Sequence, residues 1–281
     1  MSLPVNDLRD VFLDKPELVW PLPEWMLPGP ELERLRGRAG LAVVELAGRD
    51  SVAAALRAVD EGGLSALLPT YVYTGTEHGP FGQVTQAHQR LARRLPPGVE
   101  LSPLLVFGSP DFWRALNGRF LGELMTRHGF STACVGCHVY LHALRLPLAM
   151  ALGGAPIIAG ERLSHDGRTK VNQVASCLEA YRGLAADFGV ELRLPLAKVA
   201  RGAEIETILG LNWPEGGDQL GCALSGNYND PRGQARWHPE GLTRFLEGFA
   251  LPLARRVLAA YLAGDQPDHL ALAKDILTSR A

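Results

Sequence analysis

Three groups of residues in the sequence have types and spacings that suit binding or catalysis. The first is a glycine-containing run after a short apolar segment, the second is a set of three cysteines, and the third is a polar run after another apolar segment. Their members are Ala47, Gly48, Arg49, Asp50 and Ser51; Cys134, Cys137 and Cys222; and Gly160, Asp166, Arg168 and Lys170.

The run around Gly48 has the features of an anion-binding loop. Gly48 lets the backbone approach an anion closely, and the helix predicted to follow would present free N–H groups. Ser51 adds a hydroxyl and Arg49 adds a positive charge, both suited to phosphate. Without further context, Asp50 or Ser51 could equally cap the helix while Gly48 makes the turn.

The cysteines suggest a metal, a cluster or redox chemistry. Cys134 and Cys137 form a CxxC pair at the start of a predicted helix, where two thiolates can point at one metal and the helix N-terminus lowers the pKa of a thiol. Cys222, in a glycine-rich turn, offers a third ligand. His138 or His142 could complete a zinc site. Cys177 lies in an amphipathic segment and reads as a buried structural thiol.

Apolar runs of strand length alternate with segments of helical periodicity. We expect strands over 41–46, 64–73, 100–107, 155–159 and 190–194, and helices over 52–61, 84–94, 111–128, 134–150, 171–188, 203–209 and 239–262. This alternation predicts an α/β fold with a parallel five-stranded sheet and helices on both faces. Ligands then bind at the carboxyl ends of the strands, in the loops after the first, second and fourth.

The amino-acid composition limits the classes of function that we expect of the chain. The chain is 47% hydrophobic and 21% charged with a net charge of −2, so it has no overall attraction to nucleic acid or to anionic membranes. No segment reads as a signal peptide or as a run long enough to span a membrane, so we expect a cytoplasmic protein. Residues 1–38 read as an extended, proline-rich arm and residues 39–281 as one domain with a C-terminal helical extension; a homodimer is compatible with this organisation.

Residues 46–51 resemble the Ser-Gly-Gly-x-Asp-Ser loop of the PP-loop ATP pyrophosphatase superfamily. The match lies in Gly48, Asp50 and Ser51, while Leu46 and Ala47 replace the family's serine and first glycine. The CxxC pair with one later cysteine is similar to the tRNA-thiolating subgroup of that superfamily. The fold implied is Rossmann-like, of the adenine nucleotide alpha-hydrolase type.

This resemblance implies an enzyme that binds ATP and Mg²⁺, adenylates its substrate with release of pyrophosphate, and transfers sulfur. It places ATP at Ala47–Ser51 with Thr74, Gly160 and Arg168, and a [4Fe–4S] cluster with one open iron on Cys134, Cys137 and Cys222. Zn²⁺ is the alternative. Asp50 and Ser51 would activate the nucleotide, Asp166 would hold Mg²⁺, and Lys170 would stabilise the leaving pyrophosphate.

Two other functions remain open from the sequence. The two departures at Leu46 and Ala47 favour a non-enzymatic nucleotide-binding or redox-sensing protein, and structural zinc would favour a PP-loop synthetase or amidotransferase. tRNA is weakly supported as a partner, because neither extra zinc-binding elements nor a basic surface is evident.

Overall fold

The computed structural model describes residues 27–279, so most of the predicted N-terminal arm lies outside the described residues. The part that is described is not extended: residues Gly29–Arg36 form helix α2. A proline in the first turn, an acidic residue near the start (Glu31) and basic residues near the end (Arg34 and Arg36) all favour a helix here. Leu35 anchors α2 because its side chain is completely buried.

A parallel sheet runs through the centre of the domain, which confirms the predicted α/β fold. Its strands are β1 (Leu41–Glu45), β2 (Ala66–Val72), β4 (Glu100–Leu101), β5 (Leu105–Phe107), β6 (Ile157–Ile158) and β7 (Leu192–Arg193). The order across the sheet is β4-β2-β1-β6-β7, with β5 also paired to β2. The chain therefore moves one way from β1 to β2 and the other way to β6, which creates a crevice beside the carboxyl end of β1.

The predicted third strand is divided in two. β4 pairs with Ala66 and Leu67, and β5 pairs with residues 70–72 of the same strand. Pro103 lies in the gap, and its ring nitrogen has no hydrogen to donate to the neighbouring strand. The sheet therefore has six strands by hydrogen bonding, although the two pieces occupy one position.

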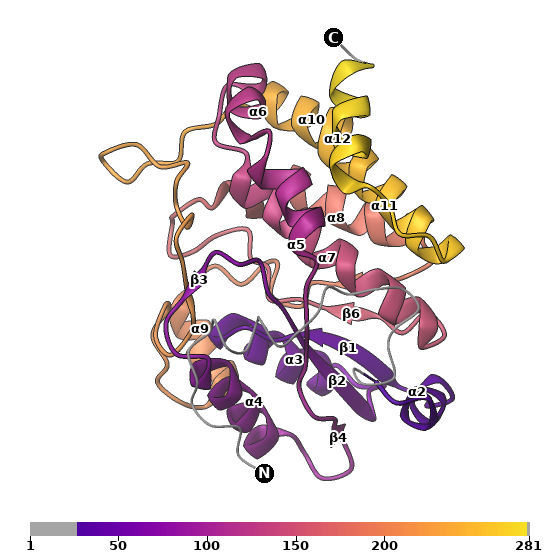
Figure 1. Ribbon diagram of the computed structural model, residues 1–281. Coiled ribbons are helices and arrows are strands. Elements are labelled where there is room, and N and C mark those ends of the chain that lie inside the picture. Colours follow the sequence, from indigo (N-terminus) through magenta and orange to yellow (C-terminus); the bar gives the residue numbers. More distant parts are fainter. Residues whose placement is uncertain (1–26, 280–281) are drawn as a thin grey trace.

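Alternate residues of β1 point to opposite faces of the sheet, and each face carries its own core. Leu41 and Val43 belong to one apolar cluster, while Ala42 and Val44 belong to the other. Helices α3 (Arg49–Asp60), α4 (Gly82–Arg94) and α9 (Gly202–Leu209) cover the second face. Helices α7 (Ala133–Ala151), α8 (Ala175–Asp187) and α11 (Leu251–Ala263) cover the first face, so both faces are buried (Figure 1).

Three long predicted helices are interrupted. The 111–128 segment consists of α5 (Pro110–Trp113), a π-helical turn (Arg114–Gly118) and α6 (Leu121–His128). The 239–262 segment consists of α10 (Pro239–Phe245), a second π-helical turn (Leu246–Ala250) and α11. The 171–188 segment begins with a 3₁₀ turn (Val171–Gln173) before α8. Helix α12 (His269–Thr278) follows α11 and was not predicted.

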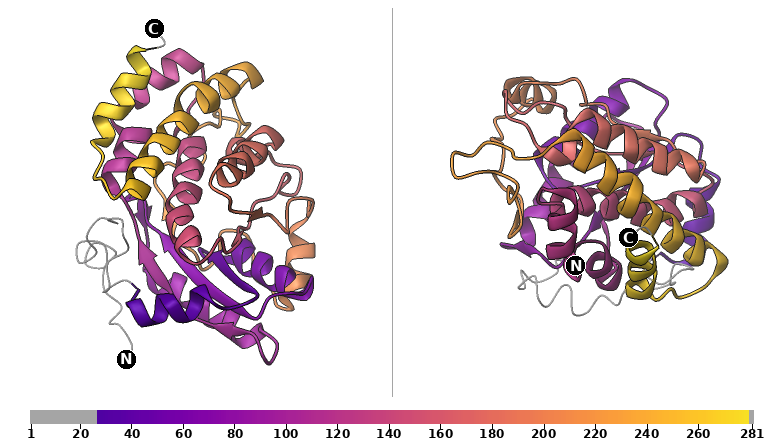
Figure 2. Two further views of the ribbon diagram at one scale, coloured as in Figure 1. Left: turned by 90° about the vertical axis from the view of Figure 1, so that its right-hand side faces the viewer. Right: turned by 90° about the horizontal axis from the view of Figure 1, so that it is seen from above.

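Helix α7 corrects the prediction that no apolar run is long enough to span a membrane. It has 19 residues and a mean hydropathy of 1.2 over its most apolar window, which is sufficient by length and composition. However, 72% of that window is buried inside the fold. The C-terminal helices, orange to yellow, lie against α7 on the side away from the sheet, so its hydropathy is that of a core helix (Figure 2).

A two-stranded ribbon lies apart from the main sheet. β3 (Glu77–His78) follows the second strand, and β8 (Gly221–Cys222) lies in the long connection between α9 and α10. The two pair antiparallel, with Glu77 opposite Cys222. This pairing brings the distant cysteine to the carboxyl edge of the main sheet.

Candidate functional site

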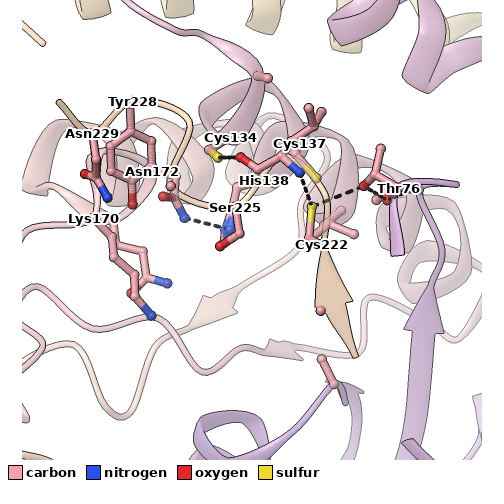
Figure 3. Close-up of a pocket in the computed structure, with 18 of the residues that line it drawn as sticks. Thr76, Cys134, Cys137, His138, Lys170, Asn172, Cys222, Ser225, Tyr228 and Asn229 are labelled. Atoms are coloured by element: carbon pink, nitrogen blue, oxygen red, sulfur yellow. Dashed lines mark hydrogen bonds between the residues drawn. The ribbon is translucent and has the colours of Figure 1, made fainter. Parts of the chain in front are cut away.

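A cavity of about 770 Å³ opens at the carboxyl ends of β1 and β2. This volume lies in the range of small-molecule and cofactor sites. The loop after β2, the N-terminal half of α7, the loop after β6 and the connection that contains β8 form its walls. The three cysteines and Thr76 lie towards one end and Lys170 with Asn229 towards the other, with Asn172 between them (Figure 3).

Helix α7 supplies one wall through a single face. Residues separated by three or four positions lie on the same side of a helix, and the pocket-lining residues of α7 follow this spacing. They are Cys134, Cys137, His138, Leu141 and Arg145, with Ala133 next to them at the start of the helix. The helical pattern predicted for 134–150 therefore places the CxxC pair, a histidine and an arginine on one surface.

The three predicted metal-binding cysteines come together at one end of the cavity. All three line it, and the sulfurs of Cys134 and Cys222 both contact the backbone of Leu224, each at 3.4 Å. Their hydrogen bonds are weak: Cys134 donates to the carbonyl of Leu224 over 3.4 Å, and Cys222 Sγ lies 3.2 Å from Thr76 Oγ1. The thiols are free of disulfides.

Burial raises the pKa of the CxxC thiols, contrary to the lowering expected at a helix N-terminus. The pKa of Cys134 rises to about 11, and that of Cys137 is also raised, in both cases because the cavity wall shields the sulfur from water. A thiol with a raised pKa is a poor nucleophile and a poor redox centre by itself. A bound metal would instead deprotonate it.

The donor set fits a cluster better than a zinc ion. Three thiolates around Zn²⁺, each about 2.3 Å from the metal, would hold their sulfurs about 3.8 Å apart. Among residues 27–279, the group with three ligand atoms within 4.8 Å of one another is His138, His142 and Glu161, so the cysteine sulfurs are more widely spaced. Zn²⁺ would therefore require the cysteine sulfurs to move closer together, whereas three thiolates without a fourth protein ligand suit a cluster with one open iron.

The two histidines do not turn towards the cysteines. His138 Nδ1 lies 2.7 Å from Glu161 Oε1, and its Nε2 lies 2.7 Å from the side-chain amide of Asn172. His142 is buried next to the same glutamate. This geometry does not support the alternative in which one of them completes a cysteine–zinc site. Cys177 is fully buried in α8, where it donates to the carbonyl of Val171, as expected of a structural thiol.

The loop after β1 has the predicted strand–loop–helix form, but its donors are partly used internally. The N–H groups of Ala47 and Gly48 donate to Ser51 Oγ at 2.9 and 3.0 Å, and that hydroxyl donates to the carbonyl of Gly48. Ala47 lines the cavity, whereas Gly48 lies against Gln219, whose Oε1 would be 2.7 Å from an added Cβ.

Gly160 lies where the end of β6 meets the start of α3. A Cβ at this position would lie 2.7 Å from the carbonyl carbon of Asp50 and 2.7 Å from the nitrogen of Ser51. Only glycine permits this approach. Gly160 therefore lies at the predicted site as a spacer that lets α3 contact β6.

Beside this loop, cationic side chains converge on Glu215. The carboxylate lies 2.9 Å from Lys170 Nζ and 2.7 Å from Arg168 Nη2. His165, Arg162 and Arg49 follow at 3.3, 3.6 and 3.8 Å. Hydrogen bonds from His165 and Lys170 hold the pKa of Glu215 well below its usual range. We call these five positive or basic residues the cationic cluster.

Three members of the cationic cluster are buried, His165 and two arginines. Arg162 is 0% exposed and Arg49 is 3% exposed, and both donate to Asp50, at 2.9 and 2.8 Å. One nitrogen of each guanidinium makes no hydrogen bond. Four permanent cations therefore share two carboxylates, Asp50 and Glu215, which leaves capacity for an anion.

The other predicted site residues have mixed positions. Arg168, Lys170 and Thr74 line the cavity, with Thr74 Oγ1 2.7 Å from Thr76 Oγ1. Asp166 is exposed and accepts a hydrogen bond from the Gly202 N–H at the start of α9, so in this structure it serves the helix end.

The sequence analysis missed several buried charges around the cavity. Glu45 ends β1, Arg145 lies 3.2 Å from it, and Arg162 belongs to the cationic cluster that surrounds Glu215. Glu45 breaks an otherwise apolar strand, and Arg145 interrupts an apolar helix face. These interruptions are signals that could have found them, because a charge inside a core element needs a partner. Glu215, in a glycine-rich turn, has no such signal.

The chain is similar to a protein of known sequence and to a solved structure. No protein-family model matches the chain. The chain is 38% identical over 221 residues to the uncharacterized protein MJ0009 of Methanocaldococcus jannaschii, which covers 78% of this chain and 79% of the relative. A crystal structure of a 4-thiouridine synthetase–RNA complex with bound ATP aligns with a TM-score of 0.46 and 18% identity, over 80% of this chain. The aligned part spans about half (53%) of that synthetase.

Proposed function

We propose that this chain, which belongs to the same family as the uncharacterized protein MJ0009, is a cytoplasmic ATP-dependent enzyme. It adenylates an acceptor with release of pyrophosphate, and sulfur then displaces the AMP. The observation that carries the proposal is the position of the cationic cluster beside the Gly48 loop, at one end of a cavity whose other end holds three cysteines. A site for a polyphosphate and a site for a sulfur-carrying centre thus share one cavity.

The phosphates would bind where Glu215 now lies. Arg49, Arg162, Arg168 and Lys170 offer the charge that a triphosphate requires, and arginine suits phosphate geometry. The free N–H groups of the first turn of α3 add to this field. Lys170 would neutralise the charge that develops on the leaving pyrophosphate.

Residues at the loop have positioning roles. Ser51 fixes the backbone of Ala47 and Gly48 through its hydroxyl, and Asp50 orients the guanidinium groups of Arg49 and Arg162. The adenosine end would extend along the cavity towards Thr74. We assign Mg²⁺, brought in with the nucleotide, to the exposed carboxylate of Asp166.

The cysteine end would hold a [4Fe–4S] cluster on Cys134, Cys137 and Cys222. Three protein thiolates leave one iron open, and the chemistry that such a group supplies is the binding of sulfur. The walls of the cavity partly shield the half-buried thiols from water, and Thr76 Oγ1 supports the sulfur of Cys222. The acceptor would enter between the two ends; tRNA is one candidate.

ATP–pyrophosphate exchange on anaerobically purified protein tests the enzymatic part. We expect exchange with the wild type, and a loss of more than about 100-fold for Lys170→Gln, because a charge contact with the leaving pyrophosphate in the transition state is worth several kcal/mol. Arg201→Gln is the matched control, since Arg201 is an exposed cation that pairs only with the nearby Glu204 on α9. No exchange with any candidate acceptor would leave a nucleotide-binding protein rather than an enzyme.

Metal analysis of the same preparation tests the cysteine end. A brown protein containing iron and acid-labile sulfide supports the cluster, and Cys222→Ser should remove the colour. A colourless protein with stoichiometric zinc bound to sulfur would contradict the cluster.

A further inference from the structure

A second group of metal-binding side chains lies beneath the cavity, away from the cysteines. His138 and His142 are one turn apart on α7, and Glu161 follows β6 by three residues. Glu161 Oε1 lies 2.7 Å from His138 Nδ1 and 3.3 Å from His142 Nε2. All three ligand atoms lie within 4.8 Å of one another. Ligands about 2.0–2.2 Å from a tetrahedral metal are about 3.3 Å apart, so only small movements would admit an ion.

The far nitrogen of each histidine also has a partner of the kind that supports metal ligands. His142 Nδ1 lies 3.7 Å from Glu45 Oε2, and His138 Nε2 lies 2.7 Å from the side-chain amide of Asn172. A metal-bound histidine commonly donates its other N–H to a carboxylate or an oxygen, which fixes the ring. Glu45 can take that role directly, and Asn172 can do so with its amide oxygen facing the ring.

Several of these atoms lack hydrogen bonds in the protein alone. His142 is 1% exposed, yet neither of its ring nitrogens makes a hydrogen bond, and Glu45 Oε2 makes none either. Buried polar atoms without partners cost about 1–3 kcal/mol each, and they call for an explanation. A metal on His142 Nε2 would give that atom a partner and would align Nδ1–H with Glu45.

We propose that His138, His142 and Glu161 form a binding site for a divalent transition metal, with Zn²⁺ as the best fit. Two imidazoles and one carboxylate are a ligand set of zinc and similar metals, whereas Mg²⁺ and Ca²⁺ prefer oxygen ligands. Three protein ligands leave a fourth position open. Because His138 also lines the cavity, a molecule in the cavity or a water would fill that position.

The site lies at the crevice between β1 and β6, and its ligands include no member of the cationic cluster and none of the cysteines. It does not depend on the proposed sulfur transfer. The alternative for these residues is a metal-free buried ion pair, in which His138 carries a proton. Burial opposes the charged forms, but the mutual attraction of the pair raises the pKa of His138 and lowers that of Glu161. In that arrangement Glu45 keeps its ion pair with Arg145 and His142 Nε2 lies 3.3 Å from Glu161, but neither ring nitrogen of His142 makes a hydrogen bond.

Zinc binding by the full chain with Cys134, Cys137 and Cys222 all replaced by serine tests the site. We expect this variant, freed of metal by a chelator, to take up one Zn²⁺ per chain in equilibrium dialysis and to unfold at a higher temperature with Zn²⁺ present. Adding His142→Asn should weaken binding by more than about 100-fold, and adding Glu45→Gln by about 10–100-fold. His88→Asn is the control, because His88 bonds the carbonyl of Ser102 elsewhere.

X-ray absorption at the zinc edge gives a readout that does not require the variants to fold. Zinc added to the wild-type chain with its cysteines alkylated should show nitrogen and oxygen neighbours with a histidine signature. Failure of the triple-serine or alkylated protein to bind zinc would overturn the proposal. Binding that is unchanged by His142→Asn would also overturn it.

Discussion

Replacing Glu215 with glutamine tests whether this carboxylate occupies a phosphate site. The change keeps the size and one hydrogen-bonding oxygen but removes the charge that faces Arg162, Arg49, Arg168 and Lys170. The exposed pair with Arg168, whose side chain is 67% exposed, contributes little. The two buried guanidiniums lose a partial counter-charge but keep Asp50, so we expect a loss of about 2 kcal/mol in stability.

That loss predicts a lower melting temperature and tighter anion binding. At about 2–4 °C per kcal/mol for a chain of this size, the midpoint should fall by about 4–8 °C. Pyrophosphate must displace Glu215 in the wild type and has no such competitor in the variant. Removing a cost of about 2 kcal/mol should therefore strengthen pyrophosphate binding about 30-fold, because 1.4 kcal/mol corresponds to a factor of ten.

Thermal unfolding with and without pyrophosphate, together with isothermal titration calorimetry, measures both effects. At a ligand concentration of 100 times the dissociation constant, pyrophosphate should add about 2.7 kcal/mol to the stability of the variant. Glu204→Gln is the control, since Glu204 is an exposed carboxylate paired with Arg201. Equal or weaker pyrophosphate binding by a folded Glu215→Gln protein would refute the reasoning.

Three further changes test other parts of the structure. Gly160→Ala should destabilise the fold by about 2 kcal/mol or more and abolish nucleotide binding, because the methyl group would collide with the Asp50 backbone; chemical denaturation checks this, and a neutral effect would contradict the close packing. Burial lowers the pKa of His128 to about 4. The unfolded chain, with a pKa near 6.5, therefore takes up a proton that the native state refuses, and stability should fall by at most about 3 kcal/mol as the pH drops from 6.5 to 4. His128→Leu should remove most of that slope in denaturation curves measured across this range, and an unchanged slope would assign it to other groups. Cys177→Ala should lose only about 1 kcal/mol and retain the full iron content, whereas loss of iron would make Cys177 a ligand.

Short sequence patterns predicted the elements of the fold that depend on interactions between residues close together in the chain. The run from Leu41 to Ser51 is a strand, a turn and a helix start because apolar spacing, a glycine and polar first-turn residues all agree. The break in the third strand also follows from one residue, Pro103, although a single strand over 100–107 was expected. The π-helical turns depend on packing between distant helices, which no local pattern contains.

Site residues could be predicted where the residue type itself indicates the chemistry. They could not be predicted where the site depends on contacts between distant segments of the chain. The three cysteines come together as expected because sulfur ligands are few and their spacing is distinctive. Glu215 and Arg162 act through convergence of segments far apart in the chain, so neither stands out in sequence. His138 and His142 were noted only as companions of the cysteines and not as partners of Glu161. The close approach of these three side chains depends on the tertiary fold and could not be predicted from the sequence.

One connection carries both Glu215 and Cys222. They are seven positions apart in the segment between α9 and α10, whose regular structure in between is the two-residue strand β8. An anion that displaces Glu215 must shift the start of this segment, while a centre held by Cys134, Cys137 and Cys222 restrains its end. If both proposed sites are occupied, we expect occupancy at one end of the cavity to change affinity at the other, and thermodynamic linkage requires that effect to be reciprocal. Protease cleavage within residues 211–238 would report both events with a single signal.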